Sequence, residues 1–328
     1  MKTGSYTGLR FIGCLLFLLC IISMSGCVGK AELAQETGAL SGEGAGTGEE
    51  TGAGQQENEE KPDITEESVK ESLSEAVSID IAEEKEVDAD YSQAFQGING
   101  CAVVYVPEDN SSYFYNKEMC TEQASPYSTF KIISALMGLH NGVIADETSA
   151  MEYNGTQYYN SAWNKDLSLR EAFQTSCIWY SRQVIDAVGS AEVKKELEEL
   201  RYGNCNITEW EGGDVNPLPE LNGFWLDSSL RISPWEQVQV LARIFEGGSS
   251  YTEEETQILR SVMQNDMENR TILYGKTGTG PDGEGWFVGF VQNGEQNKYF
   301  AVYLNDPGNQ ETANGKKAKE IAEIIMRE

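Results

Sequence analysis

Ser128 and Lys131 stand three residues apart in the run Ser-Pro-Tyr-Ser-Thr-Phe-Lys, which spans residues 125–131. If this segment is helical, a hydroxyl and an amine at that spacing share one face. Apolar residues continue to Leu139, so we expect a largely buried helix, and burial lowers the pKa of a lysine amine. A neutral amine can serve as the base that a weakly nucleophilic serine needs. The same spacing is also common on solvated helix faces, so other segments must show whether this pair is catalytic.

Three further segments carry groups of the same kind. Lys276 and Thr277 end an expected strand among glycines at 275, 278 and 280, where a ligand can approach the backbone closely. A lysine and a threonine hydroxyl at such a place suit the carboxylate of an anionic substrate. Ser176 follows an amphipathic stretch and could bring a second hydroxyl to a cleft, and residues 224–226 form a short aromatic and apolar run. Each alone has an ordinary explanation, as a surface turn, a helix cap or packed aromatic side chains.

The composition excludes several kinds of chemistry. The 328 residues carry a formal net charge of −29, which argues against nucleic acid as a partner because phosphate binding needs a basic surface. The single histidine, His140, is expected at the end of a helix and excludes a His-rich metal site. Proton transfer must then rest on Lys, Glu, Asp or Tyr. Cys177 and Cys205 have no spacing typical of a metal site, and we interpret them as core thiols.

Residues 1–27 are typical of an export signal, with Lys2 and Arg10 before an apolar run and small residues before Cys27. The apolar run is short for a stable membrane span. The site before Cys27 resembles the lipobox of bacterial lipoproteins, in which this cysteine becomes the lipidated first residue. An ordinary secretory signal and an uncleaved anchor are the alternatives. In each case the chain is expected to work outside the cytoplasm, anchored to the membrane through Cys27 in the lipoprotein case.

Residues 28–90 are predicted to be an acidic, disordered tether. They contain 19 acidic and 4 basic residues, a net charge of −15, and are rich in Gly, Ala, Thr and Ser. Low hydrophobicity with high net charge is typical of disorder, and repulsion between like charges extends such a linker. We assign no chemistry to this segment.

Residues 91–328 are predicted to form one α+β domain, in which an antiparallel sheet is flanked by helices and by a helical subdomain. A hairpin comes first, a helical middle follows, and three strands and a last helix close the chain. The expected strands are 101–106, 113–116, 272–280, 285–291 and 298–304, and the expected helices are 91–98, 128–139, 169–188, 191–200, 234–245 and 315–327.

Cys101 and Cys120 are equally distant from the expected hairpin turn at 110–111. Directly opposed positions on paired strands can be close enough for a disulfide, and an exported protein meets conditions that permit one. Both a bridge and two free thiols remain open from the sequence.

Taken together, these segments resemble the penicillin-interacting serine enzymes, in which Ser-x-x-Lys and Lys-Thr-Gly occur in this order. In detail they resemble the class D β-lactamases, and in places equally the extracellular sensor domains of β-lactam-responsive signal transducers. The resemblance covers about 91–328 and implies a β-lactamase/transpeptidase-like fold. The segments that carry it are 125–132, Ser176-Cys177-Ile178, Tyr202-Gly203-Asn204, 225–233, Lys276-Thr277-Gly278 and 285–289.

The resemblance implies roles for individual residues. Ser128 would attack the lactam carbonyl and form an acyl-enzyme. Lys131 would carry a carbamate made from carbon dioxide and act as general base, with the Trp225 indole N–H as a donor to that group. Ser176 would relay a proton to the leaving nitrogen. No other cofactor and no metal are expected.

The expected substrate site follows from the same resemblance. Lys276 and Thr277, with Gly278, would hold the substrate carboxylate, and the backbone N–H groups of Ser128 and Thr279 would form an oxyanion hole. Many relatives place an arginine at the last strand–helix junction, where the nearest residue here is Lys316.

Three functions compete on this basis, of which a serine β-lactamase is favoured. The sensors typically have asparagine at the position of Ile178, and an apolar residue there favours a dry, carbamylated lysine and turnover. A non-hydrolysing sensor and a D,D-transpeptidase are the alternatives; the Tyr202 and Trp225 motifs argue against the transpeptidase. A structural lipoprotein would leave the whole set of motifs unexplained.

Overall fold

The structure of the chain is a computed structural model that describes residues 84–213, 216–265, 271–294 and 296–327. The predicted export signal, the lipidation site at Cys27 and most of the predicted tether lie outside the described residues. No described helix combines the length and the apolar character that crossing a membrane would require.

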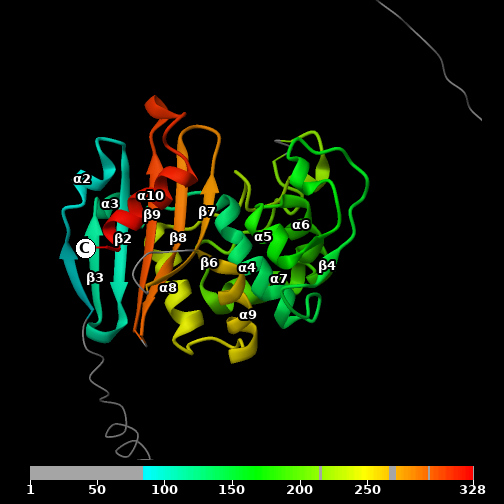
Figure 1. The fold of residues 1–328 in the computed structure, drawn as a ribbon, viewed down its shortest axis with the longest axis horizontal. Coiled ribbons are helices and arrows are strands. Elements are labelled where there is room, and N and C mark those ends of the chain that lie inside the picture. The colour runs from blue at the N-terminus through cyan, green and yellow to red at the C-terminus, as the bar shows by residue number, and fades with distance from the viewer. Residues whose placement is uncertain (1–83, 214–215, 266–270, 295, 328) are drawn as a thin grey trace, which may run out of the picture. The chain divides into compact units, whose positions relative to one another are not determined.

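One mixed sheet dominates the described part, and its seven strands follow the order β1-β3-β2-β9-β8-β7-β6 (Figure 1). Neighbouring strands are antiparallel except β1 and β3, which are parallel. The predicted hairpin and the three predicted late strands therefore join one sheet. The strands are β1 (Lys85–Asp88), β2 (Gly100–Val106), β3 (Ser111–Tyr115), β6 (Gln264–Asn265), β7 (Ile272–Thr279), β8 (Glu284–Asn293) and β9 (Gln296–Asn305).

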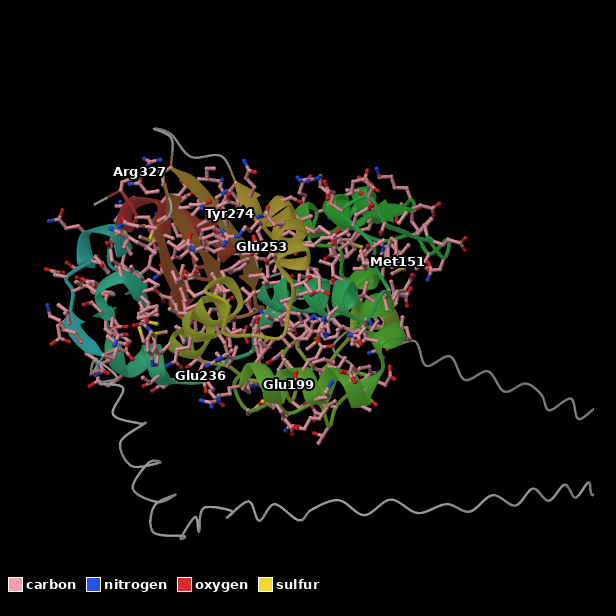
Figure 2. The ribbon with its side chains drawn as sticks, turned by 90° about the horizontal axis from the view of Figure 1, so that it is seen from below. Met151, Glu199, Glu236, Glu253, Tyr274 and Arg327 are labelled. Carbon is pink, nitrogen blue, oxygen red and sulfur yellow. The ribbon has the colours of Figure 1, made fainter. Side chains whose placement is uncertain are left out.

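The late strands are apolar almost throughout because helices cover both faces of the sheet. Along β8, Trp286 and Val288 enter one hydrophobic cluster while Phe287 and Val291 enter the other. Helix α10 (Gly315–Ile325) packs with the second cluster and crosses β8 and β9, as Figure 1 shows. The side chains of the other face fill the space between the sheet and the helices, as the sticks of Figure 2 show.

A helical region adjoins the sheet beyond β7 and contains a two-stranded sheet of β4 (Ala150–Met151) and β5 (Leu167–Ser168) (Figure 1). The other α-helices are α2 (Ser92–Phe95), α3 (Lys117–Thr121), α4 (Lys131–His140), α5 (Leu169–Gln174), α6 (Ile178–Val188), α7 (Ser190–Leu200), α8 (Pro234–Phe245) and α9 (Glu253–Met263). Short 3₁₀ turns are η1 (Pro107–Asp109), η2 (Tyr127–Phe130), η3 (Ser161–Trp163), η4 (Pro219–Leu221) and η5 (Pro307–Asn309).

Capping residues set where several of these helices begin. Ser233 caps α8 in a capping box with Glu236, and Pro234 occupies the first turn. Helix α9 begins with the same device, in which Thr252 pairs with Glu255. Helix α9 was not predicted, although Thr-x-x-Glu before an apolar run indicates a helix start.

Two predictions about the N-terminal part of the domain were wrong. The strand β1 lies within the predicted tether 28–90, so the fold begins before residue 91. Cys120 does not oppose Cys101 on a strand, because β3 ends at Tyr115 and the chain turns into α3 through Asn116, whose φ is 54°. The Cys120 thiol nonetheless interacts with the Cys101 thiol and donates to the Ala102 carbonyl at 3.4 Å, so the two cysteines are close, as expected, and both are free thiols.

Candidate active site

Ser128 and Lys131 meet where η2 passes into α4. Ser128 lies in the 3₁₀ turn and Lys131 begins the α-helix, so the pair does not share one regular helix as the sequence analysis expected. Side chains three residues apart nearly eclipse one another in a 3₁₀ turn, which brings the two groups together. The Lys131 Nζ donates to Ser128 Oγ at 3.3 Å.

The Lys131 amine is almost fully enclosed, with 2% of the residue exposed. Every residue of α4 from Lys131 to Leu139 is buried, and no carboxylate forms an ion pair with this amine among the described residues. Burial therefore lowers the pKa of Lys131 to about 8. A substantial neutral fraction at moderately alkaline pH makes this amine a suitable base for the Ser128 hydroxyl.

Ser176 and Lys276 form a second serine–lysine pair. The predicted helical stretch 169–188 is interrupted between α5 and α6, and Ser176 lies in that turn with a φ of 57°. This left-handed backbone conformation is uncommon for a residue other than glycine. The Lys276 Nζ, on β7, donates to Ser176 Oγ at 3.1 Å and to the Thr277 carbonyl at 3.0 Å.

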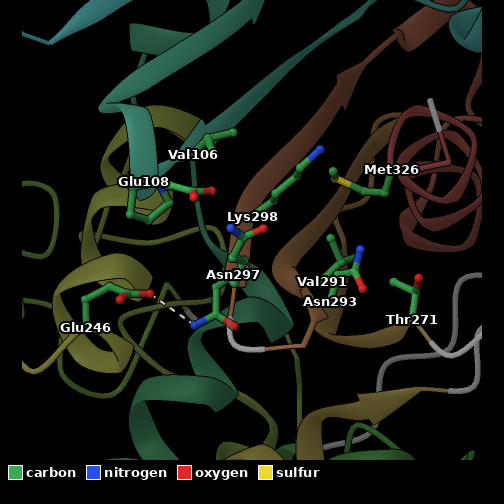
Figure 3. A pocket seen from close by; sticks show the side chains of 11 residues that line it. Val106, Glu108, Glu246, Thr271, Val291, Asn293, Asn297, Lys298 and Met326 are labelled. Atoms are coloured by element: carbon green, nitrogen blue, oxygen red, sulfur yellow. Dashed lines mark hydrogen bonds between the residues drawn. The ribbon is translucent and has the colours of Figure 1, made fainter.

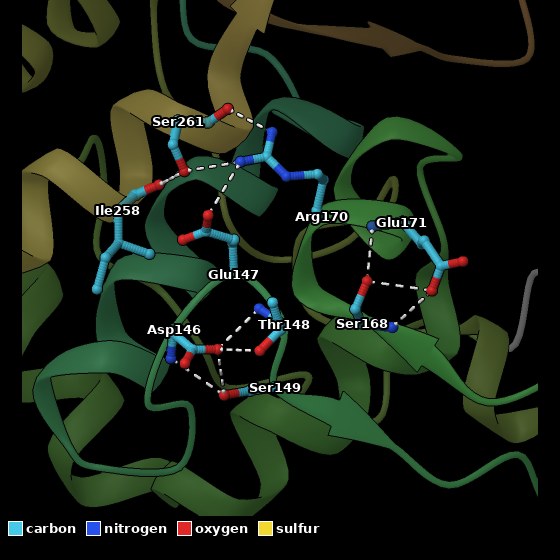
Figure 4. A network of polar contacts seen from close by, with 9 residues as sticks. All are labelled: Asp146, Glu147, Thr148, Ser149, Ser168, Arg170, Glu171, Ile258 and Ser261. Atoms are coloured by element: carbon cyan, nitrogen blue, oxygen red, sulfur yellow. Dashed lines mark hydrogen bonds and ion pairs between the residues drawn. The ribbon is translucent and has the colours of Figure 1, made fainter.

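Polar contacts around Arg170 hold the helix that leads to Ser176. Figure 4 shows Arg170 reaching from α5 to Ser261 on α9, with its guanidinium 2.8 Å from the Ser261 carbonyl and 3.3 Å from Glu147. The same helix starts with a capping box between Ser168 and Glu171. The turn that carries Ser176 is therefore fixed from the start of α5.

The charges of the two lysines connect the two pairs. Burial, together with the nearby positive charge of Lys131, lowers the pKa of Lys276 to about 7. The Lys276 amine is therefore close enough to Lys131 to respond to its charge. An anion placed between them would relieve this repulsion and restore the ammonium form of Lys276.

The strand β7 offers an open edge beside these groups. Its partner β6 pairs only with Leu273 and Tyr274, so within the described residues positions 275–279 pair with β8 alone. Gly278 lies against η2, because a Cβ there would stand 3.1 Å from the Pro126 carbonyl. Thr277 is half-buried, and Thr279 is exposed and accepts the Gly315 N–H at 3.0 Å. An extended ligand could add to this edge through its own backbone-like groups.

The Trp225 side chain is fully buried, and its indole N–H has no hydrogen-bond partner in the part of the chain that the structure describes. Its ring stacks on Phe130, the residue before Lys131, with centroids 5.3 Å apart. Its carbonyl accepts the Ser125 hydroxyl at 3.0 Å and the Tyr127 N–H at 3.1 Å. A buried donor without a partner is costly, so this N–H is available to an acceptor that the bare chain does not supply.

Two predicted residues lie at the border of this group. Ile178 begins α6, two residues after Ser176, and is half-buried. Lys316 is exposed on the first turn of α10 and follows Gly315, which contacts Thr279. The structure thus brings Lys316 to the end of β7 only through the backbone of its neighbour Gly315.

Tyr127 and Glu284 form a hydrogen bond beside the serine and were not predicted as site residues. Tyr127 directly precedes Ser128, but Glu284 is 157 residues away in the chain. A lone tyrosine and a lone glutamate carry no sequence signal of their own, so only the folded chain reveals the pair.

A cavity of about 210 Å³ lies beside β7, where Lys276 and Thr277 line it together with Gln174 and Asn265; Ser128, Lys131 and Ser176 do not line it. A cavity of about 410 Å³ lies elsewhere, between the ends of β8 and β9 and the end of α10, and Figure 3 shows Glu246, Asn297, Lys298 and Met326 around it. None of the predicted site residues lines that second cavity. Among the described residues no group of three or more His, Cys, Asp or Glu side chains could hold a metal ion.

This arrangement is suited to acyl transfer through a serine ester. It offers a hydroxyl with a weakly basic neighbouring amine, a second hydroxyl that could pass a proton, and a cationic site for a carboxylate. The backbone N–H groups near Ser128 and at the end of β7 could stabilise the oxyanion.

Comparison with known proteins finds regulatory proteins and β-lactamases among the relatives of this chain. Regulatory protein BlaR1 of Staphylococcus aureus is 33% identical over 243 residues, which is 73% of this chain and 39% of that protein. Probable β-lactamase YbxI of Bacillus subtilis is 30% identical over 235 residues, which is 71% of this chain and 82% of that protein. The chain therefore spans about two fifths of the length of the BlaR1 relatives that it matches.

The similar solved structures include the same two kinds of protein, class D β-lactamases and BlaR proteins. A class D β-lactamase from Bacillus subtilis has a TM-score of 0.65 at 29% identity, covering 73% of this chain and 94% of that one. The C-terminal domain of the Bacillus licheniformis BlaR penicillin-receptor has a TM-score of 0.67 at 29% identity, covering 75% and 97%. The predicted fold is thereby confirmed. The penicillin binding protein transpeptidase domain family matches residues 90–327, and the chain belongs to that family, with a domain of the kind found in class D β-lactamases and BlaR sensors.

Proposed function

We propose that this domain is a class D-like serine β-lactamase, which hydrolyses the cyclic amide of β-lactam antibiotics through an acyl-enzyme on Ser128. The observation that carries the proposal is the pairing of two serines with two buried lysines of lowered pKa, Ser128 with Lys131 and Ser176 with Lys276. The similarity to YbxI and to class D structures supports the same function.

Acylation uses both pairs. Ser128 Oγ bonds to the lactam carbonyl carbon as its proton passes to the neutral Lys131 amine. The carbonyl becomes an oxyanion, which the backbone N–H groups of Ser128 and Thr279 would stabilise. When the carbonyl re-forms, the C–N bond breaks and the nitrogen takes the proton of the Ser176 hydroxyl, which the Lys131 ammonium replaces, so that Lys131 is neutral again. Lys276 and Thr277 hold the substrate carboxylate during this step.

In deacylation, water is the nucleophile and the Ser128 oxygen is the leaving group. The base at Lys131 takes a proton from water, whose oxygen bonds to the ester carbonyl carbon. The bond between that carbon and Ser128 Oγ then breaks, and the serine oxygen regains its proton. The product is an open-ring amino acid, and the serine is free for a further cycle.

The site fits the carbamate that the family resemblance implies for Lys131. Only a neutral amine reacts with carbon dioxide, and burial favours the neutral form of Lys131. A buried carbamate anion also needs a donor, and the Trp225 N–H lacks a partner among the described residues. When present, such a group would supply a stronger base at this position. Ile178 would help to keep the surroundings apolar.

A non-hydrolysing penicillin sensor is the second candidate, since BlaR1 is as similar to this chain as the β-lactamases are. The two functions share acylation of Ser128 and differ in the rate of deacylation. Ile178 favours hydrolysis, because an apolar residue at this position suits a dry, carbamylated lysine.

Anchoring of the chain outside the cytoplasm through a lipid on Cys27 is part of the proposal, and metabolic labelling with a radioactive fatty acid tests it against a Cys27→Ser variant.

A chromogenic cephalosporin separates the candidates. Mixed with purified protein in bicarbonate-containing buffer, a β-lactamase gives sustained product release over many equivalents. Release that stops at one equivalent, with a stable adduct on Ser128 by intact mass, would support the sensor. A wild-type protein that forms no adduct at all, while Ser128→Ala also forms none, would exclude both.

A further inference from the structure

Two tyrosines share one carboxylate immediately behind the nucleophilic serine. The Tyr127 hydroxyl donates to Glu284 Oε2, and the Tyr303 hydroxyl donates to Glu284 Oε1 at 2.8 Å. The exposed fractions of Tyr127 and Tyr303 are 4% and 3%. Burial and the Glu284 carboxylate raise the pKa of both phenols, so both remain donors at any pH at which the protein works.

This group joins two segments that the catalytic proposal places on either side of the oxyanion. Tyr127 directly precedes Ser128, whose backbone N–H is one expected oxyanion donor. Glu284 begins β8 just across the turn from Thr279, whose N–H is the other. The Gly280 N–H donates to the Glu284 carbonyl at 2.9 Å and closes that turn. A change in the Tyr127–Glu284 bond therefore changes the spacing of the two donors.

The backbone at Tyr127 needs such support. Its φ is 47°, in the left-handed region, which is strained for a bulky residue and persists only where surrounding contacts enforce it. Its N–H is held by the Trp225 carbonyl at 3.1 Å, and its ring is held by the carboxylate at the other end. Gly280 allows the approach, because a Cβ there would stand 2.6 Å from both the Tyr127 ring and Glu284 Oε2.

Tyr303 fixes the carboxylate to the sheet. It lies on β9 opposite Trp286 of β8, and the two rings lie 4.2 Å apart. The Trp286 indole N–H in turn donates to the Ser125 carbonyl at 3.0 Å, at the start of the segment that leads to Ser128. Both sides of the serine segment are thus tied to the same pair of strands.

We propose that Tyr127, Glu284 and Tyr303 form a clamp that sets the spacing of the oxyanion-hole N–H groups of Ser128 and Thr279. The inference rests on the proposed acyl-transfer function and deepens it. The three side chains act through the backbone and do not touch the reacting atoms, so they are positioning residues. Loss of the clamp lets the η2 turn relax and misplaces a donor, and misplacement of about 1 Å can cost up to about a hundredfold in rate.

The test compares the clamp with a second tyrosine–glutamate bond of the same sheet. Tyr299, also on β9 and fully buried, donates to Glu246 at 2.5 Å far from the serine segment. Tyr127→Phe and Glu284→Gln remove clamp bonds, and Tyr299→Phe removes the matched bond. For each full-length variant we would measure the thermal midpoint, the single-turnover acylation rate constant with a chromogenic cephalosporin, and the infrared stretch of the ester carbonyl in the acyl-enzyme.

The clamp predicts that Tyr127→Phe and Glu284→Gln slow acylation about tenfold and move the ester carbonyl stretch to higher wavenumber, because a poorly placed donor polarises the carbonyl less. Tyr299→Phe should lower the thermal midpoint by a similar amount and change neither readout. If Tyr127→Phe does not fold, Glu284→Gln and Tyr303→Phe decide the matter, the latter with a smaller loss because the Tyr127 bond remains.

Acylation rates and carbonyl frequencies equal to those of Tyr299→Phe would overturn the clamp and leave the proposed function intact. Stable acylation without turnover in the wild-type protein would overturn hydrolysis alone, since acylation still reports on the clamp. A wild-type protein that is never acylated would overturn both.

Discussion

Lys276 Nζ lies 3.1 Å from Ser176 Oγ, and this hydrogen bond joins β7 to the turn between α5 and α6 across the site. The same ammonium group would have to bind the substrate carboxylate. Under the proposed function, a single buried cation would orient the proton relay and recognise the substrate, which would couple binding to proton delivery. The lowered pKa of Lys276 makes this coupling sensitive to the charge of the ligand.

The first prediction concerns the pH dependence of acylation in buffer free of carbon dioxide and bicarbonate. The pKa of Lys131 is lowered to about 8, so the neutral fraction of its amine rises about tenfold per pH unit below pH 8 and levels off above it. The acylation rate constant should follow this fraction between pH 6 and 9. Added bicarbonate should flatten the profile. A flat profile without bicarbonate would show that free Lys131 is not the base.

The second prediction is that Lys131→Met stabilises the fold at the expense of activity. The unfolded amine keeps its proton up to about pH 10.5 and the folded amine only to about 8, a difference that corresponds to about 3 kcal/mol. Below pH 8 both states are protonated and the folded state bears the whole cost of the buried charge. As the pH rises from 8 to 10.5, this cost disappears.

Denaturant unfolding at pH 6 and pH 10 measures the effect. Lys131→Met should raise the free energy of unfolding at pH 6 and give a clearly smaller gain at pH 10. Lys195→Met is the control, since Lys195 is an exposed residue paired with Glu192 at 2.5 Å and should change little at either pH. Equal gains at both pH values would contradict a lowered pKa at Lys131.

The third prediction is that Ile178→Asn lengthens the life of the acyl-enzyme. A polar amide beside Ser176 would hydrate the surroundings of Lys131 and weaken the base that activates water, while the acylation of Ser128 would change less. Since a general base contributes about a hundredfold or more, deacylation should slow by about that factor. Ile178→Val keeps the position apolar and should turn over like the wild type. Rapid deacylation in Ile178→Asn would remove this residue from the account of turnover.

Much of the fold was predictable because the signals are local. The start of α8 at Pro234 follows from its serine cap and proline, and the strands β7 to β9 follow from their continuous apolar runs. The strand β1 was not predictable, since Lys85–Asp88 has one apolar residue and forms through parallel pairing with β3. Cys101 and Cys120 do not oppose one another on paired strands because a turn at Asn116 directs the chain into α3, although their thiols still interact.

In the candidate site too, some contacts could be predicted from local spacing and others could not. The spacing of Ser128 and Lys131 brought the right groups together even though the local backbone is a 3₁₀ turn instead of a regular helix. The contact of Ser176 with Lys276 joins residues 100 positions apart and could be expected only from the family resemblance. The Tyr127–Glu284 bond had neither local spacing nor a family motif to indicate it.

The last prediction concerns the indole N–H of Trp225. In Trp225→Phe the fold loses ring volume but no hydrogen bond between described residues, whereas Trp179→Phe loses similar volume and the bond from its N–H to the Trp163 carbonyl at 3.0 Å. The volume terms largely cancel in the comparison. In buffer without bicarbonate, Trp225→Phe should therefore be less destabilising than Trp179→Phe by about 1–3 kcal/mol, the cost of leaving a buried acceptor unpaired.

With bicarbonate present, Trp225→Phe should become the more harmful of the two substitutions. If its N–H serves a carbamate on Lys131, ¹³C-labelled bicarbonate should give a carbamate NMR signal in the wild type and in Trp179→Phe, but a much weaker one in Trp225→Phe. Removal of a donor to a buried anion costs about 1.5–3 kcal/mol, which corresponds to a loss of carbamate affinity of about tenfold or more. A signal of equal strength in all three proteins would assign the unpaired N–H of Trp225 to some other acceptor, and turnover in Trp225→Phe would then be expected to match that of Trp179→Phe.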